Sequence, residues 1–249
     1  MNGPKVKRIN GLPALVFWGL VWQLLAAAVN NPLLLPGPLR VLGCLGSLSL
    51  TGAFWKTAFV SIGRVLLGVA GAVALAVALA VLTCASRLAQ ILIAPAMTAM
   101  QATPVASFTI LLLLWLDRDW VPALICGMMV LPVVWRSVHT AIGLTDRQLL
   151  EMAKVFRLGP VPVLKRIYIP SVLPFFRSAC ISALGLGWKA GIAAEVLTVP
   201  KDSIGRMISE SKLYWMTEEL FAWTLAVVIL SLLLQACMLR LLKGREQDA

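Results

Sequence analysis

Three ionisable side chains, Arg64, Lys189 and Glu195, lie inside long apolar segments of the chain. A charge at the centre of a lipid bilayer costs roughly 2.5–3.5 kcal/mol on insertion scales. These groups must therefore pair with one another or face a polar cavity. Lys189 and Glu195 are six residues apart and do not share a helix face, so at least one of them must find its partner on another helix. Two roles are open: an internal ion pair that fixes helix packing, or groups that gate or guide a small polar solute.

The rest of the chain carries few groups suited to catalysis or metal binding. It has one histidine, His139, and five cysteines whose spacing fits neither a zinc site nor a redox pair. A phosphate-binding loop, an HExxH zinc motif and a GxSxG nucleophile motif are all absent from the sequence. We therefore expect no catalytic residue, no metal and no cofactor in this chain.

The composition indicates which elements position the three charges. Of the 249 residues, 60% are hydrophobic and 13% are charged, and the mean hydropathy is +0.89. A soluble domain carries about 25% charged residues. The apolar runs suit helices that cross the hydrocarbon core, which takes roughly 20 residues. The sequence predicts an all-α polytopic membrane protein with about six spans, at residues 12–29, 57–83, 88–116, 120–141, 172–197 and 220–241.

The third predicted span contains Pro95 and Pro104. Proline removes a helix hydrogen bond and clashes with the preceding turn, so these residues predict a kinked or tilted helix. An interfacial turn followed by a shorter span is the alternative. In the fifth span, Gly185, Gly187 and Gly191 predict close helix packing, with bending near a pathway as the alternative.

The charged residues predict the orientation of the spans. If the N-terminus is cytoplasmic, the cytoplasmic segments hold 14 Lys and Arg against four Asp and Glu, whereas the outer segments hold six of each sign. Lys and Arg accumulate on the cytoplasmic side of membrane proteins. We therefore predict a single transmembrane domain over residues 1–249, with cytoplasmic tails at 1–11 and 242–249. The net charge of +11 then reflects topology and not nucleic-acid binding.

The N-terminus has two interpretations. Basic residues at positions 5–8 precede the first apolar run, and Ala26, Ala27 and Ala28 follow it, as in a signal peptide with a small-residue cleavage site. An uncleaved first helix is the other interpretation. It agrees better with an even number of spans and two cytoplasmic termini.

A polar and basic segment, residues 145–174, separates the fourth and fifth spans. Thr145 and Gln148 fit a capping box at a helix start. At helical spacing, Leu149, Met152, Ala153 and Phe156 share one face, and Arg147, Glu151 and Lys154 share another. Pro160 and Pro162 predict the end of this helix, and a second short helix over 163–168 is expected to stop at Pro170. The segment is either a surface helix on anionic lipid or a helix that docks into a groove of a cytosolic partner.

This segment resembles the "EAA" loop of ABC importer permeases of the binding-protein-dependent type. The resemblance rests on Glu151-x-Ala153 and on Ile167-x-Ile169-Pro170, whose proline comes nineteen residues after Glu151. In that family the loop is a coupling helix that docks onto the ATPase subunit. Two positions depart from the pattern. Met152 replaces an alanine, and Arg157 stands where the family usually has glycine, with Gly159 two places later.

Three further stretches resemble the nitrate/sulfonate/taurine branch of this family. They are the Leu-Pro-Gly-Pro turn at 35–38, the "SLxRVxxG"-like segment at 61–68, and Gly187-Trp188 followed by Ala194-Glu195. The resemblance spans residues 33–240 and implies a type I permease fold, with a core at 57–241 and a cytoplasmic coupling loop at 145–170.

The resemblance also implies a function and partners. It implies the membrane permease of an ABC importer in the bacterial inner membrane, working as a homodimer with an external solute-binding protein and a cytosolic ATPase dimer that binds ATP and Mg. The solute would be a sulfonate-, taurine- or nitrate-like anion or a small heterocyclic vitamin precursor. Arg64, Lys189 and Glu195 would line or gate the pathway. The residues implied in coupling to the ATPase are Leu149, Glu151, Met152, Ala153, Phe156, Arg157 and Gly159.

Two other functions are open from the residues alone. A self-sufficient secondary transporter or channel would work without an ATPase subunit, and a membrane scaffold would use its basic loop only to recruit a partner. The outer segment 202–215, where Asp202 or Ser203 can cap a helix, is either an interfacial helix or part of the rim that meets a binding protein.

Overall fold

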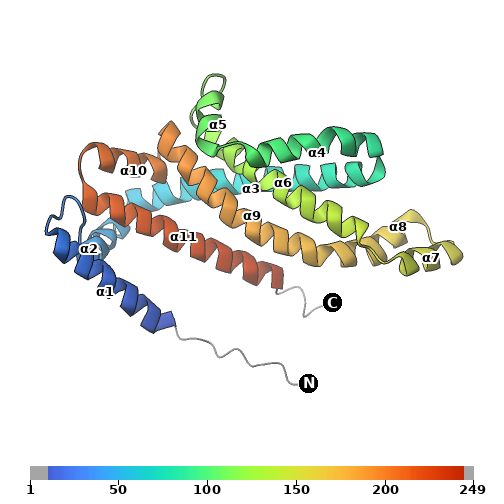
Figure 1. The fold of residues 1–249 in the computed structure, drawn as a ribbon, viewed down its shortest axis with the longest axis horizontal. Coiled ribbons are helices and arrows are strands. Elements are labelled where there is room, and N and C mark those ends of the chain that lie inside the picture. Colours follow the sequence, from blue (N-terminus) through green and yellow to red (C-terminus); the bar gives the residue numbers. More distant parts are fainter. Residues whose placement is uncertain (1–10, 244–249) are drawn as a thin grey trace. The chain divides into compact units, whose positions relative to one another are not determined.

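The computed structural model describes residues 11–243 (Figure 1). Most of the two predicted tails therefore lies outside the described residues. The described part is helical and contains no strand, which confirms the all-α prediction. Its elements are α1 (Gly11–Val29), α2 (Pro38–Ser49), α3 (Gly52–Ala85), α4 (Arg87–Ala102), α5 (Val105–Leu112), α6 (Val121–Gly143), α7 (Arg147–Val155), α8 (Pro160–Val163), the π-helical turn η1 (Leu164–Tyr168), α9 (Ile169–Thr198), α10 (Ile204–Leu213) and α11 (Thr217–Lys243).

Four helical segments in the described range are long and apolar enough to cross a membrane by themselves: Gly52–Ala85, Val121–Gly143, Pro160–Thr198 and Thr217–Leu241. Helices α4 and α5 make a fifth crossing if they are counted as one broken span. Helix α1 is apolar but shorter than the other candidate spans. The structure thus supports four of the six predicted spans outright, and a fifth only as a broken span.

The predicted third span is sharply broken. The axes of α4 and α5 differ by 104°, and the break falls at Thr103 and Pro104, which both have extended backbone. Proline disfavours the α conformation in the residue before it, so Pro104 forces Thr103 out of the helix. By contrast, Pro95 lies inside α4, which continues past it.

The described chain forms two compact units, residues 11–55 with 207–226, and residues 56–206 with 227–243. In the first unit, the predicted turn at 35–38 leads into α2, with Gly37 as its N-cap and Pro38 in its first turn. The indole N–H of Trp22 donates to the Pro36 carbonyl at 3.1 Å, and its ring stacks on Phe221. These contacts fasten the α1–α2 turn to the start of α11.

In the second unit, α6 and α9 pack along each other, and α5 covers part of both (Figure 1). One cluster in this core joins Val121 and Ile125 of α6 to Ala190 and Ala194 of α9. Close approach depends on glycine. A Cβ on Gly187 would lie 2.8 Å from Cys126 Sγ, and a Cβ on Gly191 equally close to Val65. Two of the three glycines predicted to permit close packing are therefore in tight contacts.

The chain between α7 and α9 differs from its prediction. Pro160 and Pro162 do not end a helix but begin α8, because a proline in a first turn lacks only an N–H that would have no partner there. The predicted separate helix at 163–168 is also wrong. Residues 160–198 form one continuous helical stretch, and the π-helical turn η1 lies directly before Pro170. Local π geometry accommodates the bond that this proline cannot make.

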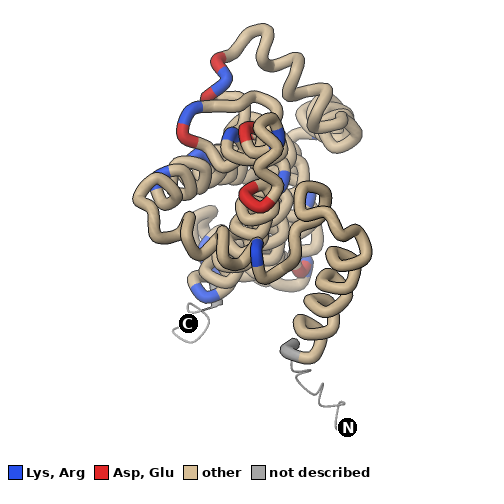
Figure 2. Tube along the Cα trace, turned by 90° about the vertical axis from the view of Figure 1, so that its left-hand side faces the viewer, with Lys and Arg blue, Asp and Glu red and all other residues tan. Residues whose placement is uncertain are grey.

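Charge is sparse along the helices. Most Lys, Arg, Asp and Glu residues of the described chain lie near helix ends or in the connections (Figure 2). This distribution fits helices surrounded by lipid, where an unpaired charge is costly.

Replacing Gly68 of α3 by alanine tests the close packing of α3 on α6. A methyl group there would collide with the backbone carbonyl of Ala123, so the helices must separate. We expect Gly68→Ala to lower the free energy of unfolding by about 1–3 kcal/mol, measured by unfolding in mixed micelles. Gly71→Ala in the same helix is the control, because nothing lies within 4 Å of its added methyl. Equal stability of the two variants would contradict this packing.

Candidate functional site

The predicted docking helix exists as α7, but its cap is not the predicted one. The Asp146 carboxylate accepts a hydrogen bond from the Gln148 N–H at 2.8 Å, which makes Asp146 the N-cap. The Thr145 hydroxyl instead donates to the Ala141 carbonyl in α6, at 3.4 Å. Helix α6 ends at Gly143 with Leu144 as its C-cap, and Asp146 caps α7, so only a short turn separates the two helices.

Helix α7 ends at Val155, before either proline, because the backbone turns at Arg157. This residue is left-handed, with φ of 53°. The Arg157 N–H bonds to the Lys154 carbonyl, and the Leu158 N–H bonds to the Ala153 carbonyl, which together form a Schellman motif. Glycine is the usual residue at the left-handed position of this motif. Arg157 thus adopts the conformation expected of the glycine it replaces, whereas Gly159 has an ordinary φ of −66°.

One face of α7 and its C-terminal turn is apolar and open to solvent. The exposed fractions are 46% for Met152, 80% for Val155 and 70% for Phe156, and Leu149 is 39% exposed. We call these four residues the α7 apolar patch. Glu151, Arg157 and Gly159 are also exposed. Ala153 was predicted on the same face but is 3% exposed, so it belongs to the side that packs against the protein.

The second candidate site is polar and lies among the helices, around the fully buried Glu195 of α9. Its Oε2 accepts hydrogen bonds from the Ser61 hydroxyl of α3 at 2.8 Å and from the Gly205 N–H at 3.2 Å. Its Oε1 lies 3.6 Å from Nη1 of Arg64. In the first turn of α10, the Gly205 N–H thus donates to the carboxylate and the Ile204 N–H donates to the Ser61 hydroxyl at 2.9 Å. The helix dipole also favours negative charge at this position.

Arg64 also contacts the α5–α6 and α9–α10 connections. Its Nη2 donates to the Lys201 carbonyl at 2.8 Å and lies 3.4 Å from Oδ1 of Asp119. Asp119 also accepts from the Lys201 N–H at 3.0 Å. Among the described residues, Nη1 of Arg64 and Oε1 of Glu195 have no hydrogen-bond partner, so the two groups meet as an ion pair without a direct hydrogen bond.

The structure therefore brings two of the three predicted intramembrane charges together. Sequence reasoning missed Ser61, Asp119 and Gly205 as members of the network. Ser61 had a usable signal, because it precedes Arg64 by three residues and so lies on the same face of α3. Asp119 comes from the connection before α6 and Gly205 from the first turn of α10, and only the tertiary structure determines where these lie.

Lys189 lies apart from this network. Its side chain is exposed on α9, and no carboxylate of the described residues forms an ion pair with it. Ser178, Ser182, Leu186 and Ala193 are exposed at compatible helical spacing, and Leu186 lies between Ser182 and Lys189 with 41% exposure. We call this stripe, in which two serines and Lys189 alternate with apolar residues, the α9 polar face.

At the start of α10, the structure decides between the two predicted caps. Ser203 accepts a hydrogen bond from the Arg206 N–H at 3.1 Å and is the cap. The Asp202 carboxylate instead meets Lys56 Nζ at 2.8 Å. This hydrogen bond from Lys56 lowers the pKa of Asp202 below its ordinary value.

Several known proteins are similar to this chain. Proteins named as ABC transporter permease or as the aliphatic sulfonates transport permease SsuC are similar over most of their length. The first, from Brucella abortus (strain 2308), is 28% identical over 233 residues, which cover 91% of each chain. The SsuC of Bacillus subtilis (strain 168) is 24% identical over 85% of this chain and 76% of its own. The SsuC of Escherichia coli (strain K12) is 26% identical over 87% and 80%.

Residues 72–244 match the family model described as binding-protein-dependent transport system inner membrane component. This range contains α7 with its apolar patch, Lys189 and Glu195. The chain belongs to the family of inner membrane components of binding-protein-dependent transport systems.

Proposed function

We propose that this chain is the permease subunit of an ABC importer, in which two copies form the pathway for a small anion. An external binding protein delivers the solute, and two cytosolic ATPase subunits bind ATP and Mg. The observation that carries the proposal is the α7 apolar patch. Exposed apolar side chains at positions 149, 152 and 156 have the spacing of a helix that enters a groove on a partner.

The connections of α7 make it a suitable lever. A short turn joins it to α6, and the helical stretch Pro160–Thr198 carries the chain directly into the membrane. Because α6 and α9 pack along each other, displacement of α7 by a closing ATPase dimer would reorient both helices together. For this coupling to do work, the ATP-bound partner must bind one orientation of α7 more tightly than the other.

The proposed orientation places α7 and both termini in the cytoplasm of a bacterial cell, with the chain in its inner membrane. The excess of Lys and Arg in the segments assigned to that side supports this orientation. Asp119, Lys201 and α10 then lie on the outer side, so the Arg64–Glu195 network supports the outer ends of α3 and α9. There it would hold the outer part of the pathway in shape, and it would not contact the solute directly.

Lys189 has a different proposed role. A lysine facing lipid near the middle of a span would cost roughly 2.5–3.5 kcal/mol. The exposed α9 polar face must therefore be covered by a second copy or by water. Two copies that enclose a water-filled pathway would provide both the second copy and the water. Small residues such as Ser182 and Ala193 permit close approach of the helices there.

An unpaired ammonium in such a pathway favours an anionic solute. The relatives named as aliphatic sulfonates transport permeases support this class of solute, because a sulfonate carries a permanent negative charge. Ser178 and Ser182 would supply hydroxyl groups along the same face of α9.

Phe156→Asp tests the docking of α7. Burial of a central aromatic side chain contributes at least about 2 kcal/mol at a binding hot spot, so we expect roughly thirtyfold weaker binding of the ATPase subunit. Co-purification and titration of the ATPase measure the effect. Leu213→Asp in α10 is the control, because Leu213 is also 70% exposed and lies on the opposite side in the proposed orientation. Equal binding by the Phe156→Asp and wild-type proteins would refute the docking site.

Lys189→Gln tests the anion pathway. Loss of the ammonium should reduce uptake of a radiolabelled sulfonate into proteoliposomes about tenfold, since a partly buried charge contact is worth about 1.5–3 kcal/mol. Lys189→Arg, which keeps the charge, should retain most uptake. Lys201→Gln is a control in an outer connection, where only backbone atoms of Lys201 join the network. Wild-type uptake by Lys189→Gln would exclude this role.

Glu195→Ala separates the structural role of the network from solute contact. It removes the buried carboxylate that pairs with Arg64 and accepts from Ser61 and Gly205. Asp119 and the Lys201 carbonyl still contact Arg64. We expect the buried donors left without a partner to lower the free energy of unfolding by about 1–3 kcal/mol. Unfolding in mixed micelles measures the loss, with the exposed Asp117→Ala as control. A fully stable Glu195→Ala protein that fails in transport would instead assign Glu195 to the pathway.

A further inference from the structure

We propose that an anionic phospholipid of the cytoplasmic leaflet binds between α3 and the junction of η1 with α9. A cavity of about 520 Å³ lies there, within the roughly 300–1,000 Å³ typical of small-molecule sites. The proposal rests on the orientation proposed above, which places this end of the helices on the cytoplasmic side. It concerns a ligand that the transport function does not require.

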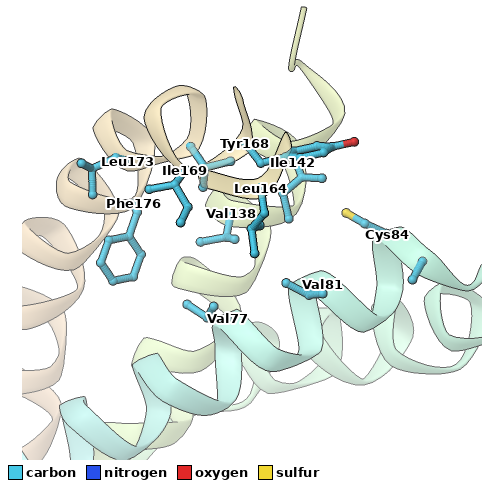
Figure 3. Close-up of a pocket in the computed structure, with 12 residues that line it drawn as sticks. Val77, Val81, Cys84, Val138, Ile142, Leu164, Tyr168, Ile169, Leu173 and Phe176 are labelled. Carbon is cyan, nitrogen blue, oxygen red and sulfur yellow. The ribbon is translucent and has the colours of Figure 1, made fainter. Parts of the chain in front are cut away.

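The cavity has walls from three separate segments (Figure 3). Val77 and Val81 of α3 form one side, Val138 and Ile142 of α6 form the back, and side chains of η1 and α9 form the other side. In Figure 3, Leu164 and Ile169 point across the space toward α3. The lining is almost entirely apolar; its polar side-chain atoms are the Cys84 thiol and the Tyr168 hydroxyl.

This cavity opens at the surface of the second unit. Val81 is 54% exposed, Leu164 52% and Ile169 47%. An apolar cavity of this kind does not hold water well, because a buried water needs two to four polar partners. Within a bilayer, the adjoining medium is hydrocarbon. An acyl chain therefore fits the lining, and its burial in the cavity restores the dispersion contacts that an empty space would lack.

The charges near the cavity select the headgroup. The lining residues fall in the segments 77–85, 138–142 and 164–176, which contain two basic residues, Lys165 and Arg166, and no carboxylate. Three further arginines, at 87, 136 and 177, lie one or two positions outside these segments. Lys165 and Arg166 directly follow the lining residue Leu164, and both are exposed. Arg87 follows the lining residue Ala85 by two positions. Basic pockets between helices at the cytoplasmic surface suit anionic headgroups.

The position of the cavity suggests what the lipid does. Leu164 and Tyr168 belong to the π-helical turn that joins the α7–α8 loop to α9. A lipid wedged beside this turn would stiffen the link between the docking helix and the membrane helix.

The test uses the full-length permease purified without ATPase, so its outcome is independent of the docking and transport proposals. Native mass spectrometry compares retention of dioleoyl phosphatidylglycerol with that of dioleoyl phosphatidylcholine, which has the same chains. We expect about a tenfold or larger preference for phosphatidylglycerol, from two cations near the headgroup. Lys165→Gln combined with Arg166→Gln should abolish the preference while some binding of both lipids persists.

Substitutions that fill the cavity provide a second test of lipid binding. Val81→Trp or Leu164→Trp, introduced from opposite walls, should each lower phosphatidylglycerol retention about tenfold. The matched control is Leu82→Trp, next to Val81 and 49% exposed but outside the lining. Equal retention of the two lipids by the wild-type protein would overturn the proposal, as would a filled cavity that retains lipid like the control. A change in oligomeric state with unchanged lipid retention would also overturn it and assign the cavity to protein contact.

Discussion

The bilayer core offers no water to polar groups, and this constraint determines how the few charges of this chain are placed. Glu195 is fully buried, yet it receives the Ser61 hydroxyl, the Gly205 N–H and the charge of Arg64. Ser61 and Arg64 come from α3, and Gly205 comes from the first turn of α10. Because a buried carboxylate without partners would be costly, the network holds α3, α9 and the first turn of α10 in one arrangement.

The same constraint makes Lys189 informative. Arg64 and Glu195 form an ion pair within the chain, whereas the Lys189 side chain is exposed on α9. The family to which the chain belongs transports solutes delivered by a binding protein. The proposed pathway between two copies would account both for the family and for a cationic group that is exposed on a single copy. The intramembrane charges thus divide into a structural pair and a proposed solute contact.

At the end of the helices opposite this network, α7 has capped ends and an exposed apolar surface. Helix α7 is short and is capped at both ends: Asp146 caps its N-terminus, and the Schellman motif at Arg157 caps its C-terminus. A left-handed conformation costs a non-glycine residue roughly 1–2 kcal/mol, and Arg157 adopts it nonetheless. Two backbone hydrogen bonds compensate part of this cost. The α7 apolar patch and the cavity beside η1 are joined by the short segment between α7 and α9. A partner bound to the patch and a lipid bound in the cavity would therefore both act on this segment.

The sequence by itself determined the helical membrane class, four of the crossings, the helix α7 with most of its exposed apolar face, and the need for Arg64 or Glu195 to find a partner. These features depend on local composition and periodicity, which a single chain displays directly. The tertiary structure alone decided that Ser61 meets Glu195 across 134 residues of sequence, and that Lys189 remains outside the network. It also decided that Ala153 is buried, that α4 and α5 bend by 104°, and that residues 160–198 continue as one helix. Such outcomes depend on which distant segments pack together, because a proline or a charge is compatible with several local conformations until its neighbours are in place.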